Sequence, residues 1–287
     1  MILSLAAALP TRAEAIVVNS STPLWYVTRA TGLVAMLLLT IGMACGLLSA
    51  VGYQRPGLPR FVTLGLHRNA TLLALAFTAI HVLTTVTDSY AHIPVQDVFI
   101  PFISAYRPLW LGLGTVAFDL LLALTITSLL RSRMSYRTWR VVHWTAYACW
   151  PVALLHGLGT GSDTPVRWVL LLTLLCVAVV TALAGWRLAV GWPGRPVARV
   201  AGAVALVLAL LAAGAWLSAG PLKPGWARRA GTPPTLLNHA AGPLAPRIDQ
   251  GREGATRPGP WATRPGPGAT RPGPGATRPG PGATRDV

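Results

Sequence analysis

Two stretches of the chain, LHRNATLLALAFTAIHV at residues 66–82 and HWTAYACWPVALLHG at residues 143–157, decide the fold and carry the chemistry. Each is an apolar run with a histidine near either end. His81 follows His67 by fourteen positions, and His156 follows His143 by thirteen. Because an α-helix rises about 1.5 Å per residue, each pair spans roughly 20 Å. Each run therefore places one imidazole near each surface of a membrane.

Around these stretches lie further apolar runs that are long enough to cross a bilayer. A hydrocarbon core needs about 20 helical residues, and six runs meet this requirement, at residues 25–48, 61–87, 108–130, 139–158, 166–188 and 197–219. The 287-residue chain is 53% apolar and only 11% charged. It lacks the alternating segments of ~10 residues that are typical of a transmembrane β-barrel. The sequence therefore predicts an all-α integral membrane protein with a six-helix transmembrane bundle.

The positive charge of the chain favours membrane topology over nucleic-acid binding. The formal net charge is +16, but the arginines of the apolar part lie in short gaps between the runs. The first, third and fifth gaps hold most of them, and short arginine-rich loops stay in the cytoplasm. We therefore expect a multi-pass protein of the plasma membrane, with both termini outside the cytoplasm and no nucleic-acid partner.

The composition divides the chain into four segments. Residues 1–23 form an N-terminal segment outside the cytoplasm, residues 24–190 a helical core, and residues 191–219 an additional transmembrane helix. Residues 220–287 are rich in Pro, Gly and Arg, and contain the heptapeptide ATRPGPG in tandem from residue 262. A segment with few apolar side chains cannot offset the entropy cost of ordering, so we expect residues 220–287 to be a disordered tail.

The histidines indicate two sites at different depths. The second and fourth apolar runs cross the membrane in the same direction, so His67 lies level with His143, and His81 with His156. Fourteen residues fall about 40° short of four helical turns, whereas thirteen fall about 140° short. We therefore expect Pro151 to kink or rewind the fourth helix, so that both of its histidines face inward.

Two imidazoles level with each other suit the axial positions of a haem better than other roles. Zinc needs three or four ligands at one point, and no cysteine or carboxylate is expected near either pair. Hydrogen bonding between helices explains one buried histidine well, but two level pairs poorly. A non-redox scaffold or transporter that binds metal or protons through these histidines is the alternative.

Five motifs carry a resemblance to a known family. They are WYVTRATG at residues 25–32, LHRN at 66–69, SAYRPLWLGLG at 104–114, YRTWRVVHW at 136–144 and PVALLHG at 151–157. With the spacing of the histidines, residues 24–190 resemble the ferric reductase-like transmembrane domain family. This superfamily includes ferric reductases, the membrane part of NADPH oxidases and the haem-binding membrane subunit of the methionine sulfoxide reductase system.

The resemblance implies two haem b groups inside the membrane. His67 and His143 would be the axial ligands of the inner haem iron, and His81 and His156 those of the outer one. Arginines bind carboxylates in a bidentate manner, so Arg68, Arg107 and Arg140 are candidates to hold haem propionates. For Arg68 and Arg140, an interfacial anchor is an equal alternative.

The implied function is that of a transmembrane cytochrome of the b type. It would pass single electrons from a cytoplasmic-side or quinol donor to an external acceptor, either ferric iron or a partner reductase. The chain carries no GxGxxG-type segment for a dinucleotide, in contrast to full ferric reductases. We therefore expect an oxidoreductase component without its own FAD/NADPH domain and without catalytic side chains. Its electrons would come from a separate flavoprotein or a quinol.

Overall fold

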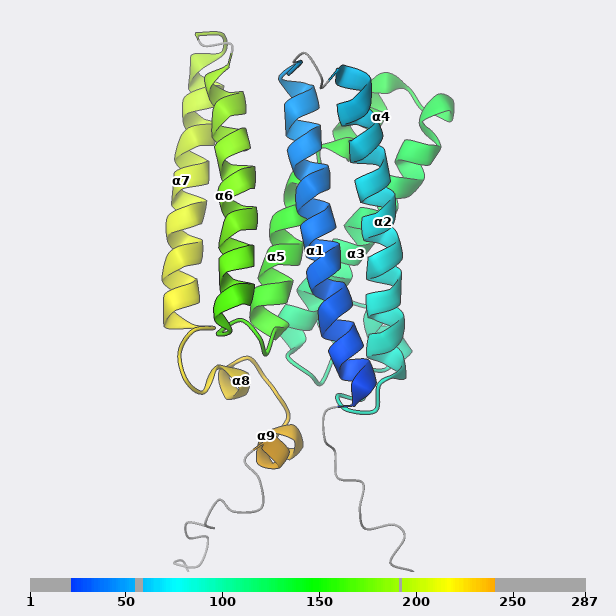
Figure 1. Cartoon of the computed structure of the whole chain (residues 1–287), viewed down its shortest axis with the longest axis vertical. Helices are drawn as coiled ribbons and strands as arrows, with labels where there is room; N and C mark the ends of the chain where they lie inside the picture. Colours follow the sequence, from blue (N-terminus) through cyan, green and yellow to red (C-terminus); the bar gives the residue numbers. More distant parts are fainter. Residues whose placement is uncertain (1–21, 55–58, 191–192, 241–287) are drawn as a thin grey trace, which may run out of the picture. The chain divides into compact units, whose positions relative to one another are not determined.

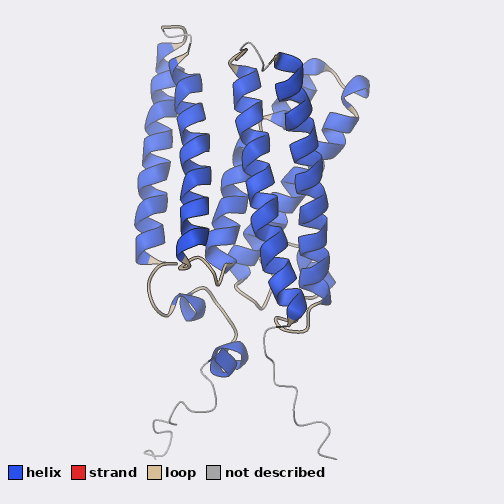
Figure 2. Cartoon of the chain, in the orientation of Figure 1, coloured by secondary structure: helices blue, strands red, loops and turns tan. Residues whose placement is uncertain are grey.

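The computed structural model describes residues 22–54, 59–190 and 193–240, and in this part of the chain all regular elements are helices (Figures 1 and 2). The long ones are α1 (Pro23–Ala50), α2 (Arg60–Thr87), α3 (Pro108–Leu129), α5 (Ala146–Thr160), α6 (Arg167–Ala189) and α7 (Pro196–Ala219). The short ones are η1 (Val95–Val98), η2 (Arg131–Arg133), α4 (Tyr136–His143), α8 (Trp226–Arg229) and α9 (Pro234–Ala240). The predicted all-helical membrane fold is confirmed.

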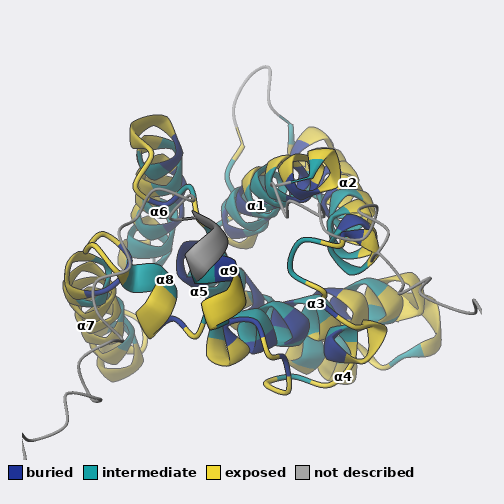
Figure 3. Ribbon diagram, turned by 90° about the horizontal axis from the view of Figure 1, so that it is seen from below, coloured by how far each residue is buried: buried dark blue, intermediate teal, exposed yellow. Residues whose placement is uncertain are grey.

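Four helices enclose the centre of the molecule. Viewed along the helix axes, α1, α2, α3 and α5 are arranged around one centre, with α6 and α7 to one side (Figure 3), and side chains from all four line a cavity. In the sequence, α1 is joined to α2 by a short loop, and α3 to α5 through η2 and α4. We refer to the two ends of the bundle as the α4 end and the α9 end, after the short helices that lie there (Figure 1).

The start of α1 is tied to the end of α2 at the α9 end. Thr22 caps α1, because its hydroxyl accepts a hydrogen bond from the Trp25 N–H at 3.1 Å, and Pro23 fits the first helical turn. The same hydroxyl donates to the Asp88 carboxylate, which follows the last residue of α2, at 2.7 Å. Further along α1, the Thr28 hydroxyl donates to that of Thr84 at 2.8 Å. These contacts fix the register of the two helices.

The expectation of six transmembrane helices is supported for five of them. In the described part of the chain, five helices are long and apolar enough to cross a membrane, namely α1, α2, α3, α6 and α7. The fourth expected span is split into α4 and α5, and the 15 residues of α5 extend only about 22 Å. The two pieces together still run from the α4 end to the α9 end (Figure 1).

The break lies at Trp144 and Thr145, several residues before the proline that was expected to cause it. Around it the backbone N–H groups reach back three residues instead of four, as in the bonds from Thr145 to Val142 at 2.9 Å and from Ala148 to Thr145 at 2.9 Å. Such a 3₁₀-type turn rotates about 120° per residue, against about 100° in an α-helix. The extra rotation recovers part of the shortfall expected from the thirteen-residue spacing, while Pro151 remains inside α5.

The disorder expected from residue 220 onward is also wrong for residues 220–240. There the chain forms α8 and α9 at the α9 end. The Trp226 indole donates to the Gly159 carbonyl at 3.1 Å, and Leu236 is buried in a cluster with Trp25 and Ile93. These two large side chains pack against the bundle and stabilise the segment, although its overall composition is poor in apolar residues. The ATRPGPG repeats lie outside the described residues.

Candidate functional site

The four histidines form two facing pairs. At the α4 end, the ring centres of His67 and His143 are 6.2 Å apart, and at the α9 end those of His81 and His156 are also 6.2 Å apart. The planes of the two rings cross at 74° and 83°, respectively. The structure therefore brings together, from α2, α4 and α5, the residues that the sequence placed at equal depth.

Three of the four imidazoles are held by a backbone carbonyl oxygen. Their Nδ1 atoms lie 2.8 Å from the Gly42 oxygen for His67, 2.7 Å from that of Thr28 for His81, and 2.9 Å from that of Trp110 for His156. Because a carbonyl oxygen only accepts, Nδ1 carries the proton and Nε2 keeps its lone pair. Histidine ligands of metals usually donate their other N–H in this way.

Each of these three rings also lies against a glycine on the neighbouring helix. A Cβ atom at Gly32 would come within 3.0 Å of the His81 ring, one at Gly46 within 3.4 Å of His67, and one at Gly114 would overlap the His156 ring. In every case the accepting carbonyl belongs to the residue four positions before the glycine. We call this arrangement, a glycine together with the carbonyl four residues earlier, the glycine cradle.

The cradle repeats along and between helices. On α1, Gly46 follows Gly32 by fourteen positions, which matches the interval between His67 and His81 on α2. Between α3 and α5 the glycine cradle occurs once, with Gly114 beneath the ring of His156. The next position at the same interval on α3 is Ser128, and the Nδ1 atom of His143 is buried without a hydrogen-bond partner in the described part of the chain.

The separation of the rings fits two ligands of one metal ion. A bond from metal to imidazole nitrogen is about 2.0–2.1 Å, and the nitrogen lies about 1.1 Å from its ring centre, so opposed ligands have ring centres about 6.3 Å apart. Both observed separations agree with this value. Among the described residues, no group of three or more His, Cys, Asp or Glu side chains could hold a metal ion, so two opposed imidazoles are the available donor set.

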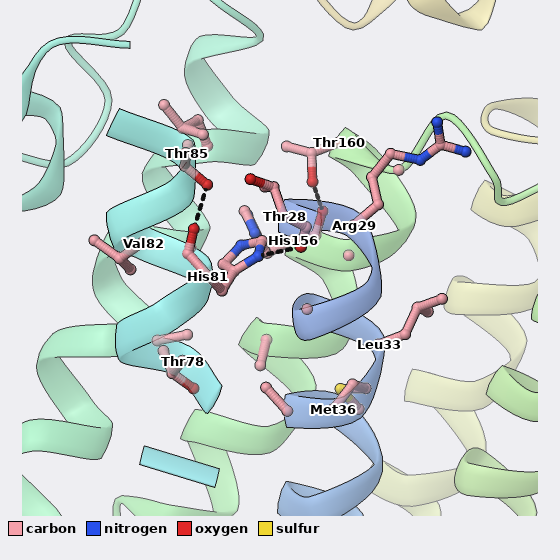
Figure 4. Close-up of a pocket in the computed structure, with 18 of the residues that line it drawn as sticks. Thr28, Arg29, Leu33, Met36, Thr78, His81, Val82, Thr85, His156 and Thr160 are labelled. Carbon is pink, nitrogen blue, oxygen red and sulfur yellow. Dashed lines mark hydrogen bonds between the residues drawn. The ribbon is translucent and has the colours of Figure 1, made fainter. Parts of the chain in front are cut away.

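A cavity of about 240 Å³ surrounds the pair at the α9 end. Figure 4 shows His81 from α2 and His156 from α5 directed toward each other inside it, with Thr28 of α1 beside them. Most of the lining is apolar, including Leu33, Met36 and Phe118. A flat, largely apolar group with a metal ion at its centre suits this environment.

Two acidic residues near the membrane-spanning core differ in their surroundings. Asp97 of η1 lines the cavity and is 4% exposed, and its Oδ2 atom is buried without a hydrogen-bond partner in the described part of the chain. Asp119 lies on an exposed face of α3. Because the three imidazoles with a bonded Nδ1 all donate to backbone carbonyls, neither carboxylate orients them.

The arginines occupy several different environments. Arg29 points away from the imidazoles (Figure 4) and forms an ion pair with Asp163, in which its Nε donates at 2.6 Å. Arg68 is exposed beside His67, and Arg140 lies over the rings of Tyr136 and Trp144. Propionate binding by Arg68 and Arg140 stays a prediction.

Arg107 lies near the cavity at the α9 end, but its side chain has protein partners. It is 4% exposed, and its guanidinium donates to the carbonyls of Gly159 at 3.1 Å and Thr160 at 2.8 Å, and to the Thr232 hydroxyl at 2.9 Å. These carbonyls are at the end of α5, where a cation is favourable. Its own backbone is left-handed, at φ 45°, and its N–H bonds to the Gly231 carbonyl at 3.0 Å. Arg107 therefore has a structural role at the end of α5. Its binding of a haem propionate stays a prediction.

Replacement of Arg107 by alanine should destabilise the α9 end. The change removes three hydrogen bonds to a buried cation and leaves the Thr160 carbonyl without its side-chain donor, while Gly159 keeps the Trp226 indole, at an expected loss of roughly 2–4 kcal/mol. Thermal unfolding in detergent would measure the loss. Arg133, which is exposed, supplies the control, because Arg133→Ala should change stability by less than about 0.5 kcal/mol. Equal stability of the two variants would contradict this assignment.

Tyr106, which precedes Arg107, is buried against Trp25, with ring centres 6.1 Å apart in an edge-to-face arrangement. Burial raises the pKa of its phenol, and the positive charge of Arg107 lowers that pKa by a smaller amount. The phenol therefore remains neutral at physiological pH.

The glycines of the cradles are the functional residues that sequence reasoning missed. A signal for two of them was present, since Gly32 and Gly46 share the fourteen-residue interval of His67 and His81. Without the antiparallel packing of α1 on α2, that interval is one of many between the 29 glycines of the chain. Only the structure shows that each glycine lies beneath a ring.

Comparison with known proteins finds a family model that the core of the bundle matches. Residues 28–154 match the family model described as "Ferric reductase like transmembrane component". This range includes His67, His81 and His143, and ends two residues before His156. No curated protein shows a significant match to the chain, and no solved structure does.

Proposed function

Because residues 28–154 match the model of the ferric reductase-like transmembrane family, we propose that the protein is a transmembrane cytochrome that carries single electrons through two haem b groups. His67 and His143 would hold one haem, and His81 and His156 the other. Haem, when bound, supplies a reversible one-electron change at its iron. The protein supplies ligation, burial and orientation.

One observation carries this proposal above the others. Two histidine pairs stand at separate depths with equal ring separations of 6.2 Å, and the Nδ1 of three of the four rings is bonded to a carbonyl. These Nδ1 bonds join neighbouring helices, but each uses only one nitrogen of its ring. They leave Nε2 of His67, His81 and His156 available. Such an arrangement favours metal ligation at both depths.

We place the α4 end in the cytoplasm and the α9 end outside, in the plasma membrane. The support is the charge of the loops, since short arginine-rich loops face the cytoplasm. The α4 end carries a concentrated basic group, Arg131, Arg133, Arg137 and Arg140. Electrons would enter there from a separate flavoprotein or a quinol. They would leave at the α9 end to an external acceptor, either ferric iron or a partner reductase.

The spectrum of the purified protein and its haem content test the proposal. We expect a low-spin b-type spectrum and about two haems per chain. Near-perpendicular ligand planes keep two iron d orbitals almost equal in energy, so both haems should give strongly anisotropic low-spin EPR signals. Metal analysis distinguishes the alternative, because zinc or copper without iron would favour a non-redox scaffold or transporter. A colourless preparation from haem-replete cells would overturn the proposal.

A further inference from the structure

His143 differs from the other three histidines in the way its ring is held. His67, His81 and His156 each donate to a carbonyl above a glycine, which fixes both the position and the plane of the ring. His143 has neither support, since its Nδ1 atom is among the buried polar atoms without a partner in the described part of the chain. It also lies at the last residue of α4, directly before the helix break. Another contact must orient it.

Trp139 supplies that contact. It precedes His143 by one helical turn on α4, so the two side chains project from the same face. Their ring centres are 4.7 Å apart and their planes differ by 19°, which is a stacked arrangement. Although it is partly buried, Trp139 also lacks a hydrogen bond in the described residues, at its Nε1 atom. Stacking is therefore the interaction that relates the two rings.

Arg131 completes the arrangement from the preceding 3₁₀ turn. Its guanidinium carbon lies 4.5 Å from the centre of the Trp139 ring, within the range of a cation–π interaction. Arg131, Trp139 and His143 thus form a continuous stack at the α4 end, with His67 facing its last ring at 74°. Arg131 belongs to η2, and Trp139 and His143 belong to α4, so the stack joins these two short helices.

We infer that Trp139 is the positioning residue of His143, and that it takes the place of a glycine cradle at this one ligand of the α4-end haem. This inference rests on the proposed function. A stacked indole fixes the plane of the imidazole but accepts no proton from it, so the His143 ligand remains a weaker electron donor than its three counterparts. The α4-end haem should accordingly depend on Trp139 both for retention and for the orientation of its ligand planes.

The experiment compares Trp139→Leu, Trp139→Phe and a matched control, Trp144→Leu, in the full chain with both haems loaded. Trp144 lies at the helix break and is exposed, so its loss tests general effects of removing an indole. Haem content, redox titration and low-temperature EPR are measured without any electron donor or acceptor protein. The α9-end haem in the same molecule reports on folding.

We expect Trp139→Leu to weaken retention of the α4-end haem about tenfold, the scale of a lost aromatic pair, and to leave the α9-end signal unchanged. Trp139→Phe should keep both haems and shift only the α4-end EPR signal, and Trp144→Leu should match the wild type. If Trp139→Leu kept both haems with wild-type EPR signals, the inference would be wrong. It would also be wrong if Trp139→Phe lost the α9-end haem as readily as the α4-end haem. A wild-type protein without haem would instead overturn the proposed function.

Discussion

Replacement of His67 by alanine is expected to remove the same haem as replacement of His143, and His81→Ala the same haem as His156→Ala. The reason is that the two rings of each pair face each other, with ring centres 6.2 Å apart. Loss of one axial ligand leaves a single imidazole where two are needed for a low-spin site. Each variant should therefore retain one low-spin haem, half of the wild-type content.

The two classes of variant should also differ in the potential of the haem that remains. At the α9 end both imidazoles donate to carbonyls, which would strengthen them as ligands and stabilise the ferric iron of the proposed haem, and the Asp97 carboxylate lines the same cavity. At the α4 end only His67 has such a bond, and Arg131 and Arg140 lie close to His143 in the sequence. The α4-end haem, left in His81→Ala and His156→Ala, should have the higher midpoint potential.

Potentiometric titration of the four single variants decides both points. His67→Ala and His143→Ala should give one curve, and His81→Ala and His156→Ala a second curve at higher potential. Agreement of His67→Ala with His156→Ala in place of His143→Ala would show that the pairing is wrong. Coincidence of all four curves would show that the hydrogen bonds of Nδ1 do not set the potentials.

Replacement of Gly114 by alanine is expected to expel the α9-end haem while the α4-end haem remains. A Cβ atom at this position would overlap both Nδ1 and Cε1 of His156. The ring must then move and lose its 2.9 Å bond to the Trp110 carbonyl. Overpacking of this kind costs about 1–3 kcal/mol, and a displaced imidazole no longer faces His81.

Alanine at two other cradle glycines should have smaller effects, and alanine at a glycine outside the cradles serves as a control. Gly32→Ala should perturb the α9-end haem less, because its Cβ would meet the His81 ring at 3.0 Å. Gly46→Ala should leave the α4-end haem bound, since 3.4 Å is an ordinary contact. Gly185→Ala, where no atom lies within 4 Å, is the matched control in α6. Haem content and EPR of the four variants measure the order, and equal haem loss in Gly114→Ala and Gly185→Ala would refute the cradle.

Much of the fold follows from the sequence alone, because hydrophobic length is a local property. A run of about 20 apolar residues forms a transmembrane helix whatever lies beside it. Five of the six expected spans, the shared level of the histidine pairs and the resemblance to the ferric reductase-like family could therefore be predicted from residues 25–219. The prediction of the fourth span failed because a helix break at Trp144 and Thr145 leaves no mark in hydropathy.

Packing between distant segments decided the rest. The glycine cradles join residues of α1 to α2 and of α3 to α5, and their function depends on a missing side chain at one point of close approach. The partners of Arg107, Gly159 and Thr232, are 52 and 125 residues away. Likewise, Trp226 and Leu236 order residues 220–240 only because a surface exists at the α9 end to receive them. The sequence by itself determined the helices and the two depths of the histidines, because hydropathy and spacing are local. Only the tertiary structure decided what holds each ring, because that support comes from backbone atoms of other helices.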